Sequence, residues 1–339
     1  MGDSTSKPHV TVVIPCRNER DFIIPCIQTV LQSDYPADKL HIAVVDGMST
    51  DGTRETINQH FAHDNRVQLM HNEKKTTPYA LNIGIRSSNS KYVMILGAHS
   101  EVDSDYINRA VDHLENSPNI GCAGGRLKSI SSNRKSEVIA KAMSSAFGVG
   151  SSHFRTGLVS GYVDTVAFGV YRRTLLDEIG YFDEDLARNQ DDEMSYRILK
   201  SGYKIYLDTH TAATYYVRNS FQKLAAQQFQ YGYWKVYVNR KHQAITTLRQ
   251  LIPLFFLLYI ISLPFCLWVG IIWLVPLILY LIVSLLVSLK LGAEVGEVFT
   301  LLCVFPTIHL SYGYGYLLGI VDFLLLRKKQ TRKHERLTR

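Results

Sequence analysis

The sequence predicts an α/β domain built on a mostly parallel sheet, followed by helices that cross a membrane. Two observations indicate this fold class. Residues 8–210 alternate apolar strand patterns with helical patterns, which is typical of a parallel sheet with helices on both faces. Residues 251–289 then form a run of 39 residues without a charged side chain, whereas one membrane crossing needs about 20.

Four strands are expected in the first part of the chain, at residues 10–15, 41–46, 67–72 and 91–96. The helical spacing of apolar side chains predicts intervening helices over 20–33, 50–62 and 78–88. Ligands of such sheets bind beyond the carboxyl ends of the strands. We expect the binding site there, in the loops PCRNE (15–19), DGMSTDGT (46–53) and GAHSE (97–101).

The charge-free run is long enough for two crossings, which we expect to turn near Trp268–Gly270. A third segment, 298–326, is apolar but carries Pro306, His309 and Asp322. If the globular part and the C-terminal tail both lie in the cytoplasm, the number of crossings is even. We therefore expect two spans and a re-entrant or interfacial third segment. Three full spans, the alternative, would place the tail outside.

Composition narrows the class of partner. The chain has 37 basic and 30 acidic residues, a net charge of +7. The last 13 residues, RKKQTRKHERLTR, hold seven of the basic residues and one acid, so the rest is close to neutral. This distribution argues against nucleic acid as a partner and favours a cytoplasmic tail that faces lipid. None of the five cysteines stands at a metal-binding spacing, and we expect reduced thiols.

Residues 219–243 connect the two parts of the chain and combine aromatic side chains with Lys and Arg. Beside a span, this composition suggests a helix lying at the membrane interface. The alternative is an amphipathic helix that covers the soluble core. The expected organisation is a globular domain at 1–218, amphipathic interface helices at 219–249, a transmembrane region at 250–326 and a basic cytoplasmic tail at 327–339.

Four stretches occur in the order and spacing of one enzyme family: VVIPCRNE (12–19), VVDGMSTDGT (44–53), LGAHSEVD (96–103) and GYFDEDLARNQDDEMSYRI (180–198). Together they resemble the family-2 inverting glycosyltransferases of the GT-A fold, over about residues 8–240. The resemblance is greatest to the succinoglycan-type exopolysaccharide glycosyltransferases, which act on lipid-linked sugars. It implies a Rossmann-like GT-A catalytic domain that binds a nucleotide-diphosphate sugar.

The resemblance places the nucleotide near the first two strand ends. Pro15, Asn18 and Glu19 match the family's nucleotide-binding loop. Asp46 ends the second strand, where a carboxylate can accept hydrogen bonds from a ribose or a base N–H, and Gly47 permits a tight turn against the ligand. A helix-start role for Glu19 and a turn or cap role for Asp46 are the alternatives.

The family holds a divalent metal with an Asp-x-Asp motif, which falls here on Gly97, Ala98 and His99. The first aspartate is absent. Mg²⁺ prefers oxygen ligands, whereas Mn²⁺ also accepts imidazole, so His99 with Glu101 could form a site that has fewer carboxylates. Diphosphate oxygens and water would complete the coordination of Mn²⁺ or Mg²⁺. Alternatively, neutral His99 hydrogen-bonds the diphosphate or the sugar directly.

The resemblance places the general base in NQDDEMSYRI. The family's Glu-Asp pair falls on Gln190 and Asp191, and Asp191 at a helix start could take the proton of the acceptor hydroxyl. Glu193 and Arg197 stand four residues apart and can pair. Gly169 lies in TVAFGVYRR, a region that the family uses near the donor sugar.

The function expected is that of a multi-pass cell-membrane enzyme with a cytoplasmic catalytic domain. It would transfer a sugar, with inversion, from a nucleotide-diphosphate sugar, a UDP-sugar in the first place, to a polyprenyl-phosphate-linked acceptor among the membrane lipids. One alternative is a small processive polysaccharide synthase, although QQFQYGYWK (227–235) lacks the arginine of the processive Q-x-x-R-W motif. Another is a non-catalytic membrane scaffold with a degenerate transferase domain.

Overall fold

The computed structural model describes residues 7–131, 133–150, 153–156, 159–246 and 248–328. The chain divides into two compact units. The sheet unit comprises Met1–Lys128 and His153–Tyr215, and the helical unit comprises Ser129–Ser152 and Tyr216–Arg339. Of the basic tail expected at 327–339, only Arg327 and Lys328 are among the described residues.

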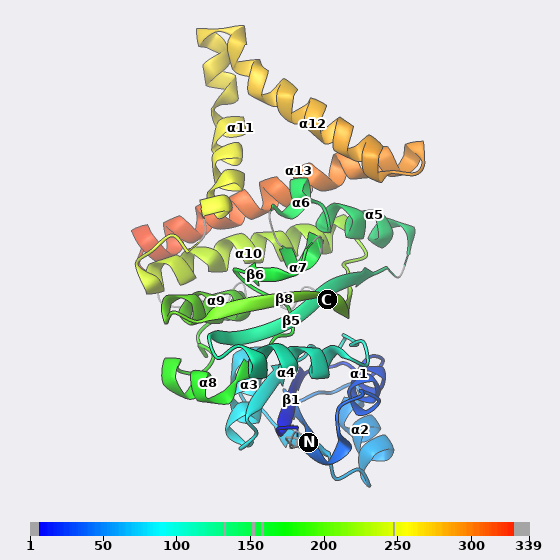
Figure 1. The fold of residues 1–339 in the computed structure, drawn as a ribbon. Helices are drawn as coiled ribbons and strands as arrows, with labels where there is room; N and C mark the ends of the chain where they lie inside the picture. Colours follow the sequence, from blue (N-terminus) through cyan, green and yellow to red (C-terminus); the bar gives the residue numbers. More distant parts are fainter. Residues whose placement is uncertain (1–6, 132, 151–152, 157–158, 247, 329–339) are drawn as a thin grey trace. The chain divides into compact units, whose positions relative to one another are not determined.

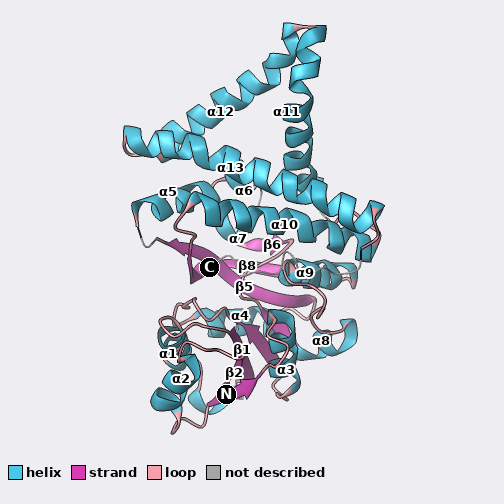
Figure 2. Ribbon diagram, turned by 180° about the vertical axis from the view of Figure 1, so that it is seen from behind, coloured by secondary structure: helices cyan, strands magenta, loops and turns pink. Residues whose placement is uncertain are grey.

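The sheet unit is built on one eight-stranded sheet in the order β3-β2-β1-β4-β7-β5-β8-β6. Figure 2 shows strands of this sheet in magenta. Strands β1 to β4 run parallel, whereas β7 pairs antiparallel with β4 and β5, and β6 pairs antiparallel with β8. The strands are β1 Val10–Cys16, β2 Leu40–Asp46, β3 Val67–His71, β4 Tyr92–Ile95, β5 Ile120–Ile130, β6 Gly161–Val163, β7 Val170–Arg172 and β8 Lys204–Tyr216. The predicted α/β class with a mostly parallel sheet is confirmed.

Helices cover both faces of the sheet. They are α1 Ile23–Leu31, α2 Thr53–Phe61, α3 Thr77–Arg86, α4 Tyr106–Asn116, α7 His153–Thr156, α8 Arg173–Ile179 and α9 Gln190–Lys200, with a short turn at Ala37–Lys39. Successive side chains of a strand point to opposite faces. Val12 and Ile14 therefore pack with apolar side chains of α1, α2 and α4, whereas Val13 packs with those of α3, α8 and α9.

The approach of α3 to the sheet depends on one glycine. A Cβ at Gly84 would overlap the side chain of Val13 on β1. Both residues are buried, and helix and strand therefore touch without an intervening side chain. Overpacking of this kind costs about 1–3 kcal/mol in a tightly packed core. The glycine in PYALNIGIR thus sets how closely this helix covers the first strand.

The helical unit contains α5 Arg134–Met143, α6 Ala146–Val149, α10 Phe221–His242, α11 Leu251–Val269, α12 Val275–Leu291 and α13 Val295–Gly319, with short turns at Leu248–Gln250, Ile271–Leu274 and Ile320–Leu325. Three of these helices, α5, α6 and α10, begin at capping residues. The side chain of Asn133 accepts a hydrogen bond from the amide of Ser136, and that of Ser220 accepts one from the amide of Lys223. Such caps satisfy amides that have no partner inside the helix.

Glycines let α13 approach two other helices closely. A Cβ at Gly315 would overlap the carbonyl oxygen of Phe229 on α10, and a Cβ at Gly313 would overlap that of Pro253 on α11. The hydroxyl of Tyr233 donates to Asp322 at 2.9 Å, which adds a buried polar contact between α10 and the turn after α13. Figure 1 shows α13 running alongside α10, whereas α11 and α12 form a hairpin that projects from α13.

Three segments among the described residues are long and apolar enough to cross a membrane: Leu248–Val269, Ile271–Leu291 and Val295–Leu325. The expected turn between the first two is confirmed, because α11 ends at Val269 and Gly270 follows it in extended conformation. The predicted C-terminal apolar helices are therefore present.

Candidate functional site

The candidate site lies at the carboxyl ends of β1, β2 and β4, which neighbour one another in the sheet. In the parallel register, Cys16 at the end of β1 stands beside Asp46 at the end of β2, and Val13 stands beside Ile95 of β4. The loops that follow these strands carry most of the residues predicted for the site. The sheet order thus brings together segments that lie far apart in the sequence.

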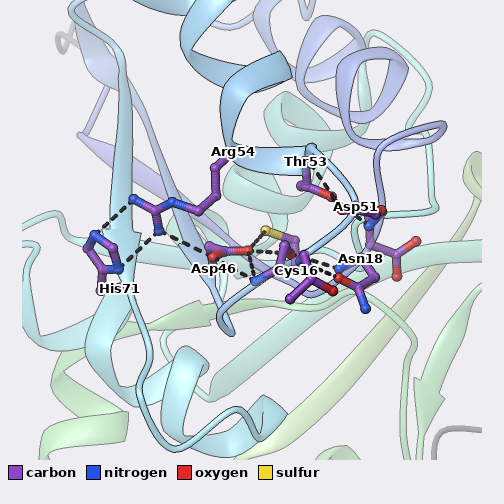
Figure 3. Close-up of polar contacts among 10 residues, drawn as sticks. Cys16, Asn18, Asp46, Asp51, Thr53, Arg54 and His71 are labelled. Carbon is purple, nitrogen blue, oxygen red and sulfur yellow. Dashed lines mark hydrogen bonds and ion pairs between the residues drawn. The ribbon is translucent and has the colours of Figure 1, made fainter.

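Asp46 is completely buried, and protein groups surround its carboxylate (Figure 3). The amide and hydroxyl of Ser49 donate to it, and the guanidinium of Arg54 lies 3.2 Å from Oδ2. Arg54 also contacts both ring nitrogens of His71, at 3.0 and 2.8 Å. Asp46 therefore joins the end of β2 to α2 and, through Arg54, to the end of β3.

Cys16 lies against this carboxylate, with 3.8 Å between Sγ and Oδ1 of Asp46. Burial raises the pKa of the Cys16 thiol well above its usual value, and the charges of Asp46 and Glu19 raise it further. The thiol is therefore neutral at physiological pH. Gly47, next in the chain, donates its amide to the carbonyl of Cys16 at 2.8 Å, which closes the turn after β2 against the end of β1.

The loop after β1 is held to the loop after β2 by hydrogen bonds. Asn18 has a left-handed backbone, with φ of 56°. Its amide donates to Ser49 Oγ and its side-chain oxygen accepts from the amide of Thr50, each at 2.8 Å. The amide of Glu19 donates to Thr53 Oγ1 at 2.9 Å. Pro15 lies in β1 itself, opposite Val45.

Glu19 and His99 meet across the ends of β1 and β4. Oε1 of Glu19 lies 3.5 Å from Nδ1 of His99, and the Glu19 side chain is 3% exposed. The His99 ring lies 5.7 Å from the ring of Tyr215 at the end of β8. The sequence paired His99 with Glu101, whereas the carboxylate at its Nδ1 belongs to Glu19.

Glu101 is held through its backbone. Its amide donates to Thr214 Oγ1 at 3.1 Å, and its carbonyl accepts from the amide of Thr214 at 2.7 Å. Ala98 is buried and belongs to the core that packs on α1 and α4. Of the three residues at the family's metal motif, only His99 therefore offers a ligand atom.

Phe168 occupies the space beside Gly97, the position of the missing aspartate. A Cβ at Gly97 would lie 3.2 Å from Cε1 of Phe168, which has a left-handed backbone with φ of 52°. The hydroxyl of Tyr106 donates to the carbonyl of Phe168 at 3.1 Å, which helps to hold this conformation. Gly169 packs on β5, because a Cβ there would overlap Sγ of Cys122.

The donor set determines what kind of metal site could form. Among the described residues, no three His, Cys, Asp or Glu side chains gather as a metal-binding group. One imidazole, with the Glu19 carboxylate 3.5 Å from its Nδ1, fits a metal ion that takes its remaining ligands from diphosphate and water. These residues fit a metal ion that is bound together with a diphosphate substrate, to which His99 offers one imidazole nitrogen.

Asp191 lies at the start of α9, after Asn189, which has φ of 62°. Within the described part of the chain, its carboxylate accepts a hydrogen bond only from the amide of Asp192, at 3.0 Å. Asp191 is exposed to solvent. Partial desolvation by nearby protein raises the pKa of its carboxyl and the charge of Asp192 raises it further, whereas backbone amides and the charge of Arg155 lower it.

The next acid of α9 has a structural role. Glu193 is completely buried and receives the guanidinium of Arg197 at 2.9–3.1 Å, as the spacing predicted. Arg197 also donates to the carbonyls of Ile179, Gly180 and Tyr181. This pair anchors the start of α9, where Asp191 stands.

Sequence reasoning missed two groups of residues at the site. Arg54 and His71 close the Asp46 network. Arg155 of α7 lies with its guanidinium carbon 5.9 Å from the ring centre of Tyr215, the same ring that contacts His99. Neither arginine stands in a motif, and only the sheet order brings these groups together.

Residues 11–180 match the Glycosyl transferase family 2. The dolichyl N-acetyl-alpha-D-glucosaminyl phosphate 3-beta-D-2,3-diacetamido-2,3-dideoxy-beta-D-glucuronosyltransferase of Methanococcus voltae is 28% identical over 323 residues, which cover 92% of this chain and 97% of that protein. The succinoglycan biosynthesis protein ExoA of Rhizobium meliloti (strain 1021) is 31% identical over 255 residues, which cover 74% of this chain and 76% of that protein.

Among solved structures, the mannosyltransferase PcManGT from Pyrobaculum calidifontis, in complex with GDP-Man and Mn²⁺, matches with a TM-score of 0.62. The identity is 20%, and the match covers 94% of this chain and 89% of that one. At this identity the similarity establishes the fold. The resemblance expected from the four motifs is therefore confirmed in sequence and in fold.

Proposed function

Because the chain belongs to glycosyl transferase family 2, we propose that it moves a sugar from a nucleotide-diphosphate sugar to a lipid-linked acceptor, with inversion at the anomeric carbon. The observation that supports this most directly is Asp191. It offers a carboxylate that solvent can reach and that accepts a hydrogen bond from only one described group, the amide of Asp192. An acceptor hydroxyl can therefore bind to an oxygen of this carboxylate.

In the proposed reaction, Asp191 takes the proton of the acceptor hydroxyl as its oxygen attacks the anomeric carbon. The bond from that carbon to the diphosphate oxygen breaks in the same step. A raised pKa suits this role, because it makes the carboxylate a better base. No covalent intermediate with the protein is required.

The donor diphosphate would lie at the ends of β1 and β4. His99 would bind the diphosphate either directly or through a divalent cation, and Glu19 would hold the imidazole in position through Nδ1. Such a cation, when bound, supplies charge that stabilises the leaving diphosphate. Mn²⁺ and Mg²⁺ are the candidates. Asn18 and Asp46 are proposed to shape the nucleotide loop through the contacts described above. The other residues proposed for the site are Pro15, Gly47, Ala98, Glu101 and Gly169.

The acceptor is proposed to be a polyprenyl-phosphate-linked sugar at the cytoplasmic membrane surface. The Methanococcus voltae relative, a dolichyl phosphate glycosyltransferase, supports this class. The exposed apolar surface of α11 and α12 is consistent with it, since Trp268 is 95% exposed and Ile271 79% exposed. Trp268 and Trp273 flank the hairpin turn, where tryptophan side chains favour the membrane–water interface.

We propose two crossings, by α11 and α12, with α13 lying at the membrane surface. The third candidate segment has 31 residues, far more than the approximately 20 of one crossing. It is also 28% buried in the protein over its most apolar part, against 6% and 11% for the other two. Glu297 and Asp322, near its ends, bind Lys141 and Lys328 at 2.8 and 2.7 Å.

Processive synthesis is not favoured. The tryptophan of a Q-x-x-R-W motif would correspond to Trp234, with Tyr233 at the arginine position. Trp234 is completely buried and packs against Tyr237 and Phe323. Its ring is therefore part of the contact between α10 and the turn after α13, and it offers no surface on which a growing glycan could stack.

A donor screen would test the proposal. Full-length protein in detergent would be incubated with UDP- and GDP-sugars and polyprenyl-phosphate-linked acceptors, and product would be followed by mass spectrometry. We expect transfer from one nucleotide class, with the anomeric configuration inverted by NMR. Chelator should reduce turnover, and Mn²⁺ should restore it. No transfer from any of these donors, with or without Mn²⁺, would favour the scaffold alternative.

A further inference from the structure

Arg155 is the feature of the sheet unit that neither the family motifs nor the proposed mechanism uses. It lies in the four-residue helix α7, His153–Thr156, and its side chain is half-buried. Among the described residues it makes no hydrogen bond or ion pair, and its contacts are with the rings of Phe154 and Tyr215. Arginine carries five N–H donors in a planar fork that matches phosphate.

The surroundings of Arg155 connect the two ends of the proposed site. The guanidinium carbon lies 5.9 Å from the ring centre of Tyr215, and the ring of His99 lies 5.7 Å from the same ring. Arg155 also lies close enough to Asp191 to act on it electrostatically. Arg155 thus neighbours the proposed base and shares the Tyr215 ring with His99, the proposed diphosphate ligand.

We propose that Arg155 binds a phosphate group of a substrate during transfer. This inference rests on the proposed function and identifies a cation of the site. Stacking on Tyr215 would hold the guanidinium plane while its N–H groups stay free for the phosphate oxygens.

Two substrates could supply the phosphate: the donor diphosphate and the acceptor's polyprenyl phosphate. The variant Arg155→Gln separates them by calorimetry with UDP and GDP, and by the KM for a polyprenyl-phosphate-linked acceptor. A charge-assisted hydrogen-bonded contact is worth about 10- to 100-fold in affinity. A loss of this size in nucleotide affinity assigns Arg155 to the donor. A KM increase of this size with unchanged nucleotide affinity assigns it to the acceptor.

Arg155→Lys keeps the charge but not the planar fork, and we expect an effect smaller than that of Arg155→Gln. Arg86→Gln is the matched control, because Arg86 also stacks on a tyrosine, Tyr181 at 5.1 Å, and has no part in the proposed site. Thermal unfolding of all three variants separates a binding loss from misfolding.

The pH profile supplies a readout that a purely structural role would not change. The charged and titratable groups that act on Asp191 are Arg155, Asp192 and Tyr171. Arg155 lowers the pKa of Asp191, so the acid limb of kcat should move to higher pH in Arg155→Gln and stay in place in Arg86→Gln. If Arg155→Gln and Arg155→Lys both leave nucleotide affinity, acceptor KM and the acid limb as in wild type, the inference is overturned. Wild-type protein that binds neither nucleotide and transfers nothing would instead overturn the proposed function, and this inference with it.

Discussion

Replacing Asp46 tests whether this residue shapes the nucleotide loop or only binds the nucleotide. In Asp46→Ala, the guanidinium of Arg54 loses its partner at 3.2 Å, and Ser49 loses the acceptor for its amide and hydroxyl. Breaking one side of a buried ion pair costs about 3–5 kcal/mol. Because the Arg54 side chain is 25% exposed and can regain water, we take the lower end, about 3 kcal/mol.

This loss should appear in thermal unfolding of the full-length protein in detergent. For a unit of about 150–250 residues, 1 kcal/mol shifts Tm by about 2–4 °C, so we expect Asp46→Ala to unfold about 6–12 °C lower. Asp64→Ala is the matched control, because Asp64 pairs with Arg66 at 2.7 Å on a more exposed part of the same unit, where such pairs contribute about 0–1 kcal/mol. If Asp46→Ala has the same Tm as Asp64→Ala but no longer binds UDP or GDP, Asp46 is a nucleotide ligand. The claim that Asp46 shapes the loop is then refuted.

Three further predictions concern the base, the altered metal motif and the membrane. The pKa of Asp191 is raised above 3.8, so turnover should fall as the pH drops through that raised value. Asp192→Asn removes a charge that raises this pKa and should move the acid limb of kcat to lower pH. An acid limb that does not move in Asp192→Asn would contradict the assignment of Asp191 as the base. Gly97→Asp alone should lower activity, because Phe168 crowds the new side chain. Combining Gly97→Asp with Phe168→Ala should recover part of the activity with Mg²⁺. Equal activity of the single and the double variant would argue against this steric account. A cysteine at Gly270 should react with a membrane-impermeant maleimide in intact cells, whereas protection there with labelling only after lysis would rule out crossing by α11 and α12.

The sequence predicted the elements well because their signals are local. Apolar strand patterns predicted the first four strands, and helical spacing predicted the helices between them. Gly270 stands between two apolar runs, which predicted the turn there. The Glu193–Arg197 pair follows from positions four residues apart on one helix. Such features depend on residues that are neighbours in the chain.

The partners within the site could not be predicted in the same way. Asp46 meets Arg54 and His71 because β1, β2 and β3 are adjacent, and Glu19 meets His99 because β4 lies on the other side of β1. Spacing alone favoured Glu101 as the partner of His99, and a role of Glu101 in metal binding stays a prediction. Arg155 lies in a helix too short to show periodicity.

The most direct test of the central claim is the initial rate of sugar transfer by Asp191→Asn, compared with wild type and Asp192→Asn at saturating donor. The change keeps the shape of the side chain and removes the proton acceptor. A positioned general base contributes about 10²–10⁴-fold, so we expect Asp191→Asn to lose at least about a hundredfold in rate while binding the nucleotide normally. Asp192→Asn should stay within about threefold of wild type, because the claim assigns it no proton transfer. Asp191→Asn turning over at a rate close to that of Asp192→Asn would contradict the claim that Asp191 is the base of an inverting transfer.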